Sequence, residues 1–290
     1  MRFLVAAYNL ALFVVFLPCN LMLLYIICKN KKLRIFWAYK IFAHTAAVDI
    51  LLLFVNAGAG LMNIMNDEVP KPILNVLYAL SITVKQTETL LSFTLAVNRL
   101  FVMLNITVLQ RNYVYNSLLA ISWLVGTVTT THILSTLSSS SYIISYYYYD
   151  GRFLFSKLYY KATLVLQAVL AGIAAVFYTA IILKLSFQKN RVSKKEVFLF
   201  IQSIVPFVWL FVIELLIQFK ESKIVSEGVF MVTFNVFARL LPGLHIILYF
   251  VFNKILRSEM LIFCRMKKRI QPKFYEEKLK TVMNQRNRWM

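Results

Sequence analysis

Residues 3–28 read FLVAAYNLALFVVFLPCNLMLLYIIC, and the basic segment KNKKLR (29–34) follows at once. A helix of about 20 apolar residues is long enough to cross the hydrocarbon core of a bilayer. Six more apolar stretches of this kind follow, at roughly 36–65, 73–104, 114–136, 158–187, 197–219 and 227–252. The sequence therefore predicts an all-α fold, a seven-transmembrane helix bundle in a domain 1–265, with a basic cytosolic tail at 266–290.

The composition supports a membrane protein and not a soluble domain. Of the 290 residues, 60% are hydrophobic, and the mean hydropathy is +0.69. The apolar stretches do not alternate with polar residues, and they are longer than the roughly ten-residue strands of a membrane barrel. Helices also satisfy their backbone hydrogen bonds within each segment, as a lipid environment requires.

The basic residues lie on alternate connections between the spans. The net charge is +20, and 23 of the 32 Lys and Arg residues fall in 29–40, 99–111, 184–195 and the segment from Lys254 onward. Cytoplasmic loops carry such an excess. The sequence therefore predicts a multi-pass protein with its N-terminus extracellular and its C-terminus cytosolic. Because the charges flank the spans, they do not predict nucleic-acid binding.

A short amphipathic segment follows the last span, at residues 253–265. Leu256, Met260 and Phe263 fall on one helical face, and basic residues lie beside them. Such a segment is typical of a helix that lies along the inner membrane surface. Cys264 at its end is a candidate for palmitoylation, and a free cytosolic thiol is the alternative.

The longest connection, at about 137–157, is polar but rich in tyrosine. Tyrosine rings are enriched at the depth of the lipid headgroups, so an interfacial aromatic belt is one interpretation. A lid over a ligand pocket is the other. We favour the belt, because nothing in the sequence ties this loop to the bundle.

Apart from Glu214, which is expected to be exposed at the interface near the outer end of its span, four ionisable residues within the predicted spans are candidates for the bundle interior. An ionisable residue at membrane depth costs roughly 2.5–3.5 kcal/mol on insertion scales, so each is expected to face the bundle interior. Asp49 is predicted to be an interior polar node. Lys85 and Glu88 lie three residues apart on one helix, which favours an internal ion pair over an anchor for an anionic ligand. Arg239 either pairs with Glu88 across the bundle or lines a pocket.

No enzyme signature occurs in the chain. There is no Gly-rich phosphate loop, no HExxH motif and no nucleophile elbow. Asp49 and His44, five residues apart, do not define a catalytic pair, and His44 and His132 are expected to be hydrogen-bonded interior histidines. The sequence therefore predicts neither an enzyme nor a cofactor.

Six of the predicted spans contain distinctive polar, aromatic or proline residues. They are Asn20, Leu33-Arg34, Asp49, Asn98-Arg99, Trp123, Pro206, His245-Ile-Ile-Leu-Tyr249 and Asn253-Lys-Ile-Leu-Arg257. In this order the set resembles the rhodopsin-like G-protein-coupled receptors, across residues 3–265. The Asn98-Arg99 pair and the last two segments are most similar to the nematode serpentine chemosensory receptors.

The resemblance implies roles for several residues. Arg99 matches the arginine of the Asp-Arg-Tyr motif that gates the cytosolic face, and Asn98 replaces the acid of that motif. Asp49 matches the aspartate that binds sodium in many members, with Asn20 in the same interior node. Tyr249 matches the tyrosine of the Asn-Pro-x-x-Tyr switch.

The resemblance also has departures. Pro206 matches the kink of the sixth span, but Ile204 stands where a tryptophan is common. His245 and Ile246 replace the Asn and Pro of the seventh-span switch, so Pro242 is expected to supply the bend there. The cysteine pair that joins the third span to the outside is absent.

The expected function is therefore a G-protein-coupled receptor of the plasma membrane, chemosensory in kind. Its expected partners are a small-molecule ligand, a heterotrimeric G protein and the lipid bilayer. Lys85, Glu88 and Arg239 are the candidate ligand-binding residues. The alternative is a transporter or channel in which these polar residues and Asp49 line a pathway, and a third class is a scaffold or assembly subunit without a ligand of its own.

Overall fold

The computed structural model describes residues 2–65, 70–104, 112–143, 148–153, 157–187, 194–221 and 236–264. Its elements are α1 (Arg2–Lys29), α2 (Lys31–Arg34), α3 (Trp37–Met65), α4 (Lys71–Met103), α5 (Asn112–Thr136), β1 (Leu137–Ile143), β2 (Tyr148–Phe153), α6 (Lys157–Phe187), α7 (Lys194–Glu221), α9 (Leu241–Phe252) and α10 (Lys254–Phe263). The fold is predominantly helical, as predicted. The basic tail 266–290 lies outside the described residues.

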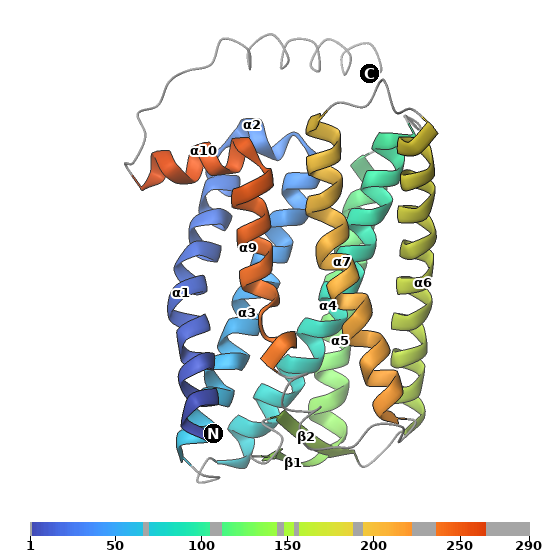
Figure 1. Cartoon of the computed structure of the whole chain (residues 1–290). Helices are drawn as coiled ribbons and strands as arrows, with labels where there is room; N and C mark the ends of the chain where they lie inside the picture. The colour runs from blue at the N-terminus through green and yellow to red at the C-terminus, as the bar shows by residue number, and fades with distance from the viewer. Residues whose placement is uncertain are drawn as a thin grey trace.

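The long helices form one bundle. Helices α1, α3, α4, α5, α6, α7 and α9 run along a common direction and contact one another in neighbouring pairs (Figure 1). The start of α1 and the strands β1 and β2 lie at one end of the bundle, while α2 and α10 lie at the other (Figure 1). The beginning of the first described helix and the last described helix therefore lie at opposite ends of the bundle.

Helix α4 is the central element. It contacts α3, α5, α6 and α7 as well as both strands. Short hydrogen bonds join it to α5, with 2.5 Å between Thr129 Oγ1 and Gln86 Oε1, and 2.5 Å between the hydroxyl oxygens of Thr83 and Thr130. Because neighbouring helices cover α4, it carries polar residues that a lipid-facing helix could not.

The outside of the bundle is apolar. Large apolar side chains such as Val14, Leu124, Val165 and Val176 are more than 60% exposed. Exposed apolar patches of this extent mark a surface that another apolar medium covers. Since these residues lie on long helices, the surface fits a lipid environment.

Four described helices are long and apolar enough to cross a membrane. They are Phe3–Lys29, Trp37–Met65, Asn112–Ser135 and Val165–Phe187. A fifth is added when the bent pair Val236–Phe252 and Lys254–Phe263 is taken as one span. The chain is therefore a multi-pass membrane protein by the length and composition of its described helices.

The connection between α5 and α6 differs from the prediction. The strands Leu137–Ile143 and Tyr148–Phe153 pair in antiparallel fashion, with Ser141 opposite Asp150, and both strands contact α4. The expectation that nothing ties this loop to the bundle is thus wrong, and the all-α class has to admit a hairpin. The side chains of its tyrosines lie outside what the structure describes.

Helix α10 confirms the predicted amphipathic segment. It turns by 101° from the preceding helix and lies across the end of the bundle (Figure 1). Asn253 caps it, because its Oδ1 accepts a hydrogen bond from Leu256 N at 3.2 Å. Leu256 and Met260 are buried, whereas Phe263 is 52% exposed and packs its ring edge-on against Tyr25 of α1, with centroids 5.5 Å apart.

The two prolines that were predicted to bend helices occupy different positions within their helices. Pro206 lies inside α7, as expected for a kink residue. Pro242 instead occupies the first turn of α9, directly after a turn at residues 239–240. Proline is favoured at this place because the first helical N–H groups have no intrahelical acceptor. The break in the helix therefore precedes Pro242 and does not arise at it.

A close approach between α4 and α5 depends on Gly126. A Cβ atom there would overlap Thr87 Oγ1 and lie 3.3 Å from Thr83 Cγ2. Thr87 is buried and β-branched, so its side chain cannot rotate away freely. We expect Gly126→Ala to lower the free energy of unfolding by about 1–3 kcal/mol through overpacking, seen as a lower Tm of the purified protein.

The matched control for this substitution is Gly172→Ala in α6. A Cβ atom at Gly172 meets nothing within 4 Å, so the helix is expected to gain up to about 1 kcal/mol from the lost flexibility. A Gly126→Ala protein that melts at or above the wild-type temperature would contradict the packing described between α4 and α5.

Candidate functional site

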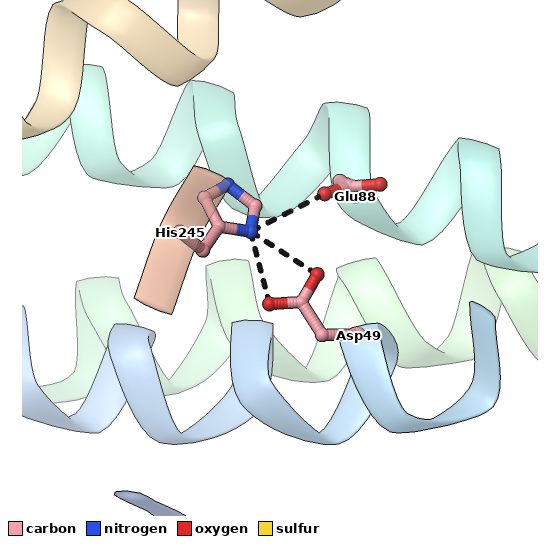
Figure 2. A group of neighbouring side chains, drawn as sticks. All are labelled: Asp49, Glu88 and His245. Carbon is pink, nitrogen blue, oxygen red and sulfur yellow. Dashed lines mark hydrogen bonds and ion pairs between the residues drawn. The ribbon is translucent and has the colours of Figure 1, made fainter. Parts of the chain in front are cut away.

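Three ionisable side chains from three helices meet in the middle of the bundle. Asp49 comes from α3, Glu88 from α4 and His245 from α9 (Figure 2). His245 Nδ1 lies 2.9 Å from Asp49 Oδ2, 3.1 Å from Asp49 Oδ1 and 3.8 Å from Glu88 Oε1. We call these three residues the acid–histidine cluster.

The cluster is shut off from solvent. Asp49 is 0%, Glu88 3% and His245 4% exposed. An ionised carboxylate can only accept hydrogen bonds, so the short contacts fit an Nδ1–H of His245 that donates to Asp49. Glu88 Oε1 is buried and has no hydrogen-bond partner among the described residues. The cluster therefore holds one acceptor oxygen that its surroundings do not satisfy.

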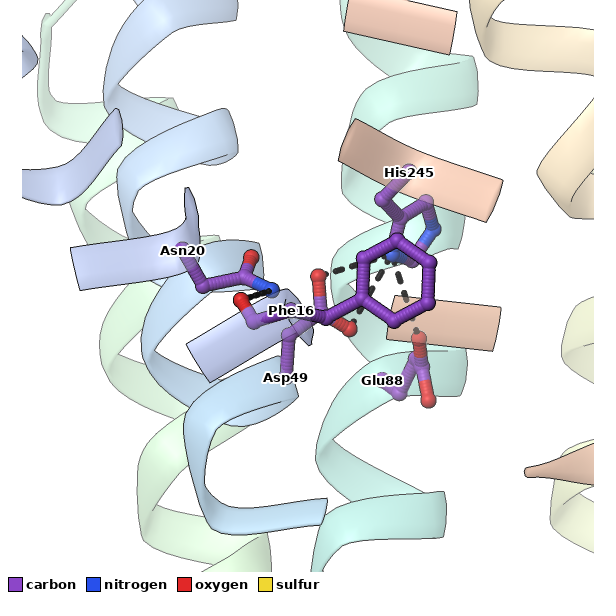
Figure 3. A network of polar contacts seen from close by, with 5 residues as sticks. All are labelled: Phe16, Asn20, Asp49, Glu88 and His245. Atoms are coloured by element: carbon purple, nitrogen blue, oxygen red, sulfur yellow. Dashed lines mark hydrogen bonds and ion pairs between the residues drawn. The ribbon is translucent and has the colours of Figure 1, made fainter. Parts of the chain in front are cut away.

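Helix α1 closes the cluster from one side. Asn20 is fully buried and donates from Nδ2 to Phe16 O at 3.0 Å, and Figure 3 draws both residues together with the cluster. The Phe16 ring packs against Gly243, where it would leave no room for a Cβ atom. The predictions that Asn20 and Asp49 lie in the interior are confirmed.

Aromatic rings extend the cluster toward the end of the bundle that carries α10. The rings of His245 and Tyr249 are nearly parallel, with centroids 6.0 Å apart and an interplanar angle of 9°. Tyr249 in turn packs against Phe42, with centroids 4.6 Å apart. Tyr249 is 2% exposed, so the contact between the cluster and this tyrosine is fully inside the bundle.

Arg99 lies further along the same interior, on α4. It is 4% exposed, and Tyr39, Tyr178 and Tyr249 are the titratable side chains that interact with it electrostatically. Its Nε and Nη2 atoms have no hydrogen-bond partner within the described part of the chain. A buried donor without an acceptor costs about 1–3 kcal/mol, and more when it is charged. Arg99 would therefore gain energy from any acceptor that reaches it.

The helices around Arg99 are joined by polar contacts. Tyr178 donates its hydroxyl to Ser203 O at 3.2 Å and so links α6 to α7. Tyr39 donates to Asn253 Oδ1 at 3.3 Å and so links α3 to the cap of α10. Asn98, beside Arg99, is 4% exposed. These contacts hold the helix ends at this face together around the arginine.

The three predicted ligand-binding residues lie in different surroundings. Glu88 belongs to the acid–histidine cluster, which is not the partner set that the sequence predicted. Lys85 is half-buried one turn away on α4. Arg239 is 8% exposed in the turn before α9, where its main-chain carbonyl accepts a hydrogen bond from Asn56 Nδ2 at 3.4 Å.

The structure also describes the surroundings of His44 and Cys264. His44 is hydrogen-bonded as expected, because Trp123 Nε1 donates to its Nδ1 at 3.0 Å. Cys264 is exposed, with its Sγ 3.7 Å from Met22 Sδ. The structure therefore joins α3 to α5 through His44 and leaves the Cys264 thiol at the surface.

His245 is a functional candidate that the sequence alone did not reveal. In the sequence it is only a replacement for the asparagine that the resemblance implies in the seventh span. The sequence did hold a signal for this pairing. Buried ionisable residues in a membrane usually pair with one another, and Asp49 had no predicted partner. What the sequence lacked was a reason to join two residues that are 196 positions apart.

A small hollow lies between α4, α6 and α7. Its lining includes Thr89, Ser92, Ala171 and Phe207. Its volume is 10 Å³, which is room for about one water molecule. Ligand pockets for small molecules span about 300–1,000 Å³, so a ligand between these helices would require them to separate.

No protein-family model matches this chain, and no curated protein sequence matches it either.

Proposed function

We propose that the chain is a seven-transmembrane G-protein-coupled receptor of the plasma membrane, chemosensory in kind. Its N-terminus lies outside the cell, and α10 lies at the cytosolic face. A small molecule binds between the outer halves of α4, α6, α7 and α9 and favours a bundle with an open inner end. A heterotrimeric G protein then binds at that end.

The observation that carries this proposal is the buried polar path through the bundle. The path runs from the acid–histidine cluster through Tyr249 to the guanidinium of Arg99, whose Nε and Nη2 atoms have no hydrogen-bond partner among the described residues. A ligand can shift an equilibrium only by its different affinity for the two states. A buried arginine with unmet donors supplies the second state, because its hydrogen bonds improve when the inner end opens to a partner.

The arrangement of the chain ends also supports the proposal. The start of α1 and the helix α10 lie at opposite ends of the bundle, which an odd number of crossings requires (Figure 1). Helix α4 carries polar residues, but four other helices surround it, so it can cross the bilayer without facing lipid. The basic segments 29–40 and 254–257 lie at the α10 end, where the positive-inside rule expects the cytosol.

The function is tested with the purified full chain in nanodiscs and heterotrimeric G proteins of several subtypes. Volatile and water-soluble small molecules are screened for accelerated nucleotide exchange on the G protein. The proposal predicts that at least one compound accelerates exchange in a way that requires the receptor. If receptor-containing nanodiscs never accelerate exchange, with or without compounds, the receptor assignment fails.

A transporter or channel is the second candidate, and one observation favours it. Ionisable residues at membrane depth mark ion and substrate pathways in many transport proteins, and three of them meet here. Protein-containing vesicles separate the two functions. Flux of an ion or solute that needs the chain but no G protein would favour transport.

A further inference from the structure

We propose that the acid–histidine cluster binds a divalent transition-metal ion of the zinc class. Its three ligands would be one carboxylate oxygen of Asp49, Oε1 of Glu88 and Nδ1 of His245. Such an ion would join α3, α4 and α9 in the middle of the bundle. The inference concerns this cluster alone and holds whether or not the chain activates a G protein.

The donor set selects the kind of ion. Zinc is bound in proteins by imidazole nitrogen and carboxylate oxygen, often with three protein ligands and one open position. The hard ions magnesium and calcium take oxygen ligands instead. The resemblance in the sequence implies sodium at Asp49, but His245 adds a nitrogen donor that a hard monovalent ion does not use.

The geometry brings the donors to one point. The ligand atoms of Asp49, Glu88 and His245 all lie within 4.8 Å of one another. Zinc–ligand bonds are about 2.0–2.2 Å long, so two ligand atoms on one tetrahedral ion lie about 3.5 Å apart. His245 Nδ1 already lies 2.9 Å from Asp49 Oδ2 and 3.8 Å from Glu88 Oε1, and the two carboxylates would have to approach each other by at most about 1.3 Å.

Charge balance gives an independent reason. The charged groups whose field acts on Glu88 are Asp49 and His245, and Glu88 Oε1 has no hydrogen-bond partner in the described ranges. When His245 Nδ1 binds a metal the imidazole is neutral, so two metal-bound carboxylates would bring two negative charges into a low-dielectric interior, where they need a cation beside them. A divalent ion neutralises both charges, whereas sodium would leave one.

The test measures metal directly in the purified full chain. After purification in detergent with metal-depleted buffers, the protein is supplied with zinc, desalted and analysed by mass spectrometry for metal content. We expect about one zinc ion per chain and a higher Tm with zinc than with sodium or magnesium. Cobalt substituted for zinc should give the visible absorption bands of a tetrahedral site.

Variants assign the ion to the cluster. His245→Gln and Glu88→Gln should each lose the bound zinc and the zinc-dependent rise in Tm. The matched controls are His44→Gln, which removes an interior histidine elsewhere, and Cys264→Ser, which removes an exposed thiol; both should retain the zinc. Zinc that persists in His245→Gln would overturn the proposal.

The wild-type protein alone also decides the question if a variant fails to fold. Folded wild-type protein that retains no zinc and shows no zinc-dependent change in Tm would overturn the proposal. A rise in Tm with sodium that equals or exceeds the rise with zinc would overturn it as well.

Discussion

Replacing Arg99 with alanine is expected to reduce ligand-evoked G-protein activation strongly while the protein still reaches the cell surface. A charge-assisted hydrogen bond contributes about 1.5–3 kcal/mol, which corresponds to a loss of roughly 10-fold to more than 100-fold in activation. Nucleotide exchange on the G protein and antibody labelling of intact cells measure the two quantities.

The thermal stability of the same variant separates this role from a structural one. In the closed bundle, Arg99 is buried and two of its donor atoms lack partners among the described residues. Removing such a group should leave the Tm unchanged or raise it. Arg34→Ala is the matched control, because it removes an exposed positive charge near the same face and should keep activation near the wild-type level. Full signalling by Arg99→Ala would contradict the proposed role.

Replacing His245 with alanine is expected to have the largest effect on stability. It leaves the carboxylates of Asp49 and Glu88 buried next to each other without the imidazole that lies between them. Removing one partner of a buried charged pair typically costs about 3–5 kcal/mol. The expected result is a large fall in the Tm of the purified protein, measured with and without added zinc.

A double-mutant cycle shows whether the two residues act together. Asp49→Asn and His245→Asn are each expected to destabilise the protein, and the double variant should lose less than the sum by about 0.5–3 kcal/mol. His44→Ala removes an interior histidine that bonds a neutral partner, so it should cost only about 0.5–1.5 kcal/mol for that bond. Strictly additive losses at positions 49 and 245 would mean that the pair does not couple.

The sequence predicted most helices to within a few residues, for a clear physical reason. Long apolar runs must be helical in lipid. The predicted span 114–136 therefore agrees with the helix Asn112–Thr136, and the predicted span 158–187 agrees with the helix Lys157–Phe187. The strands Leu137–Ile143 and Tyr148–Phe153 were not predicted, since serines and tyrosines suit a strand and a headgroup-level loop equally well. Which of these forms depends on the contact with α4, and the sequence does not show that contact.

The sequence predicted which residues of the site are buried better than it predicted which of them contact one another. Asp49, Asn20 and Glu88 are buried, as the cost of a polar group in lipid requires. The expected partner of Glu88 was Lys85, because residues three apart on a helix are visible as neighbours in a sequence. The actual neighbour, His245, comes from a helix at the other end of the chain, and the packing of α9 against α3 brings it close.

Two features of the bundle are connected in a way that a switch between two arrangements of the helices requires. The acid–histidine cluster ties α3, α4 and α9 together, and the stacked ring of Tyr249 connects it to the surroundings of Arg99. A change that separates these helices therefore affects the middle and the inner end of the bundle together. Such coupling is what a receptor needs in order to report an outer event inside the cell.

The most direct test of this account is the side of the membrane on which each chain end lies. Epitope tags at both ends are probed with antibody on intact and on permeabilised cells. An odd number of crossings with the proposed orientation predicts staining of the N-terminal tag on intact cells and of the C-terminal tag only after permeabilisation. Staining of both tags on intact cells, or of neither, would contradict the seven-transmembrane receptor.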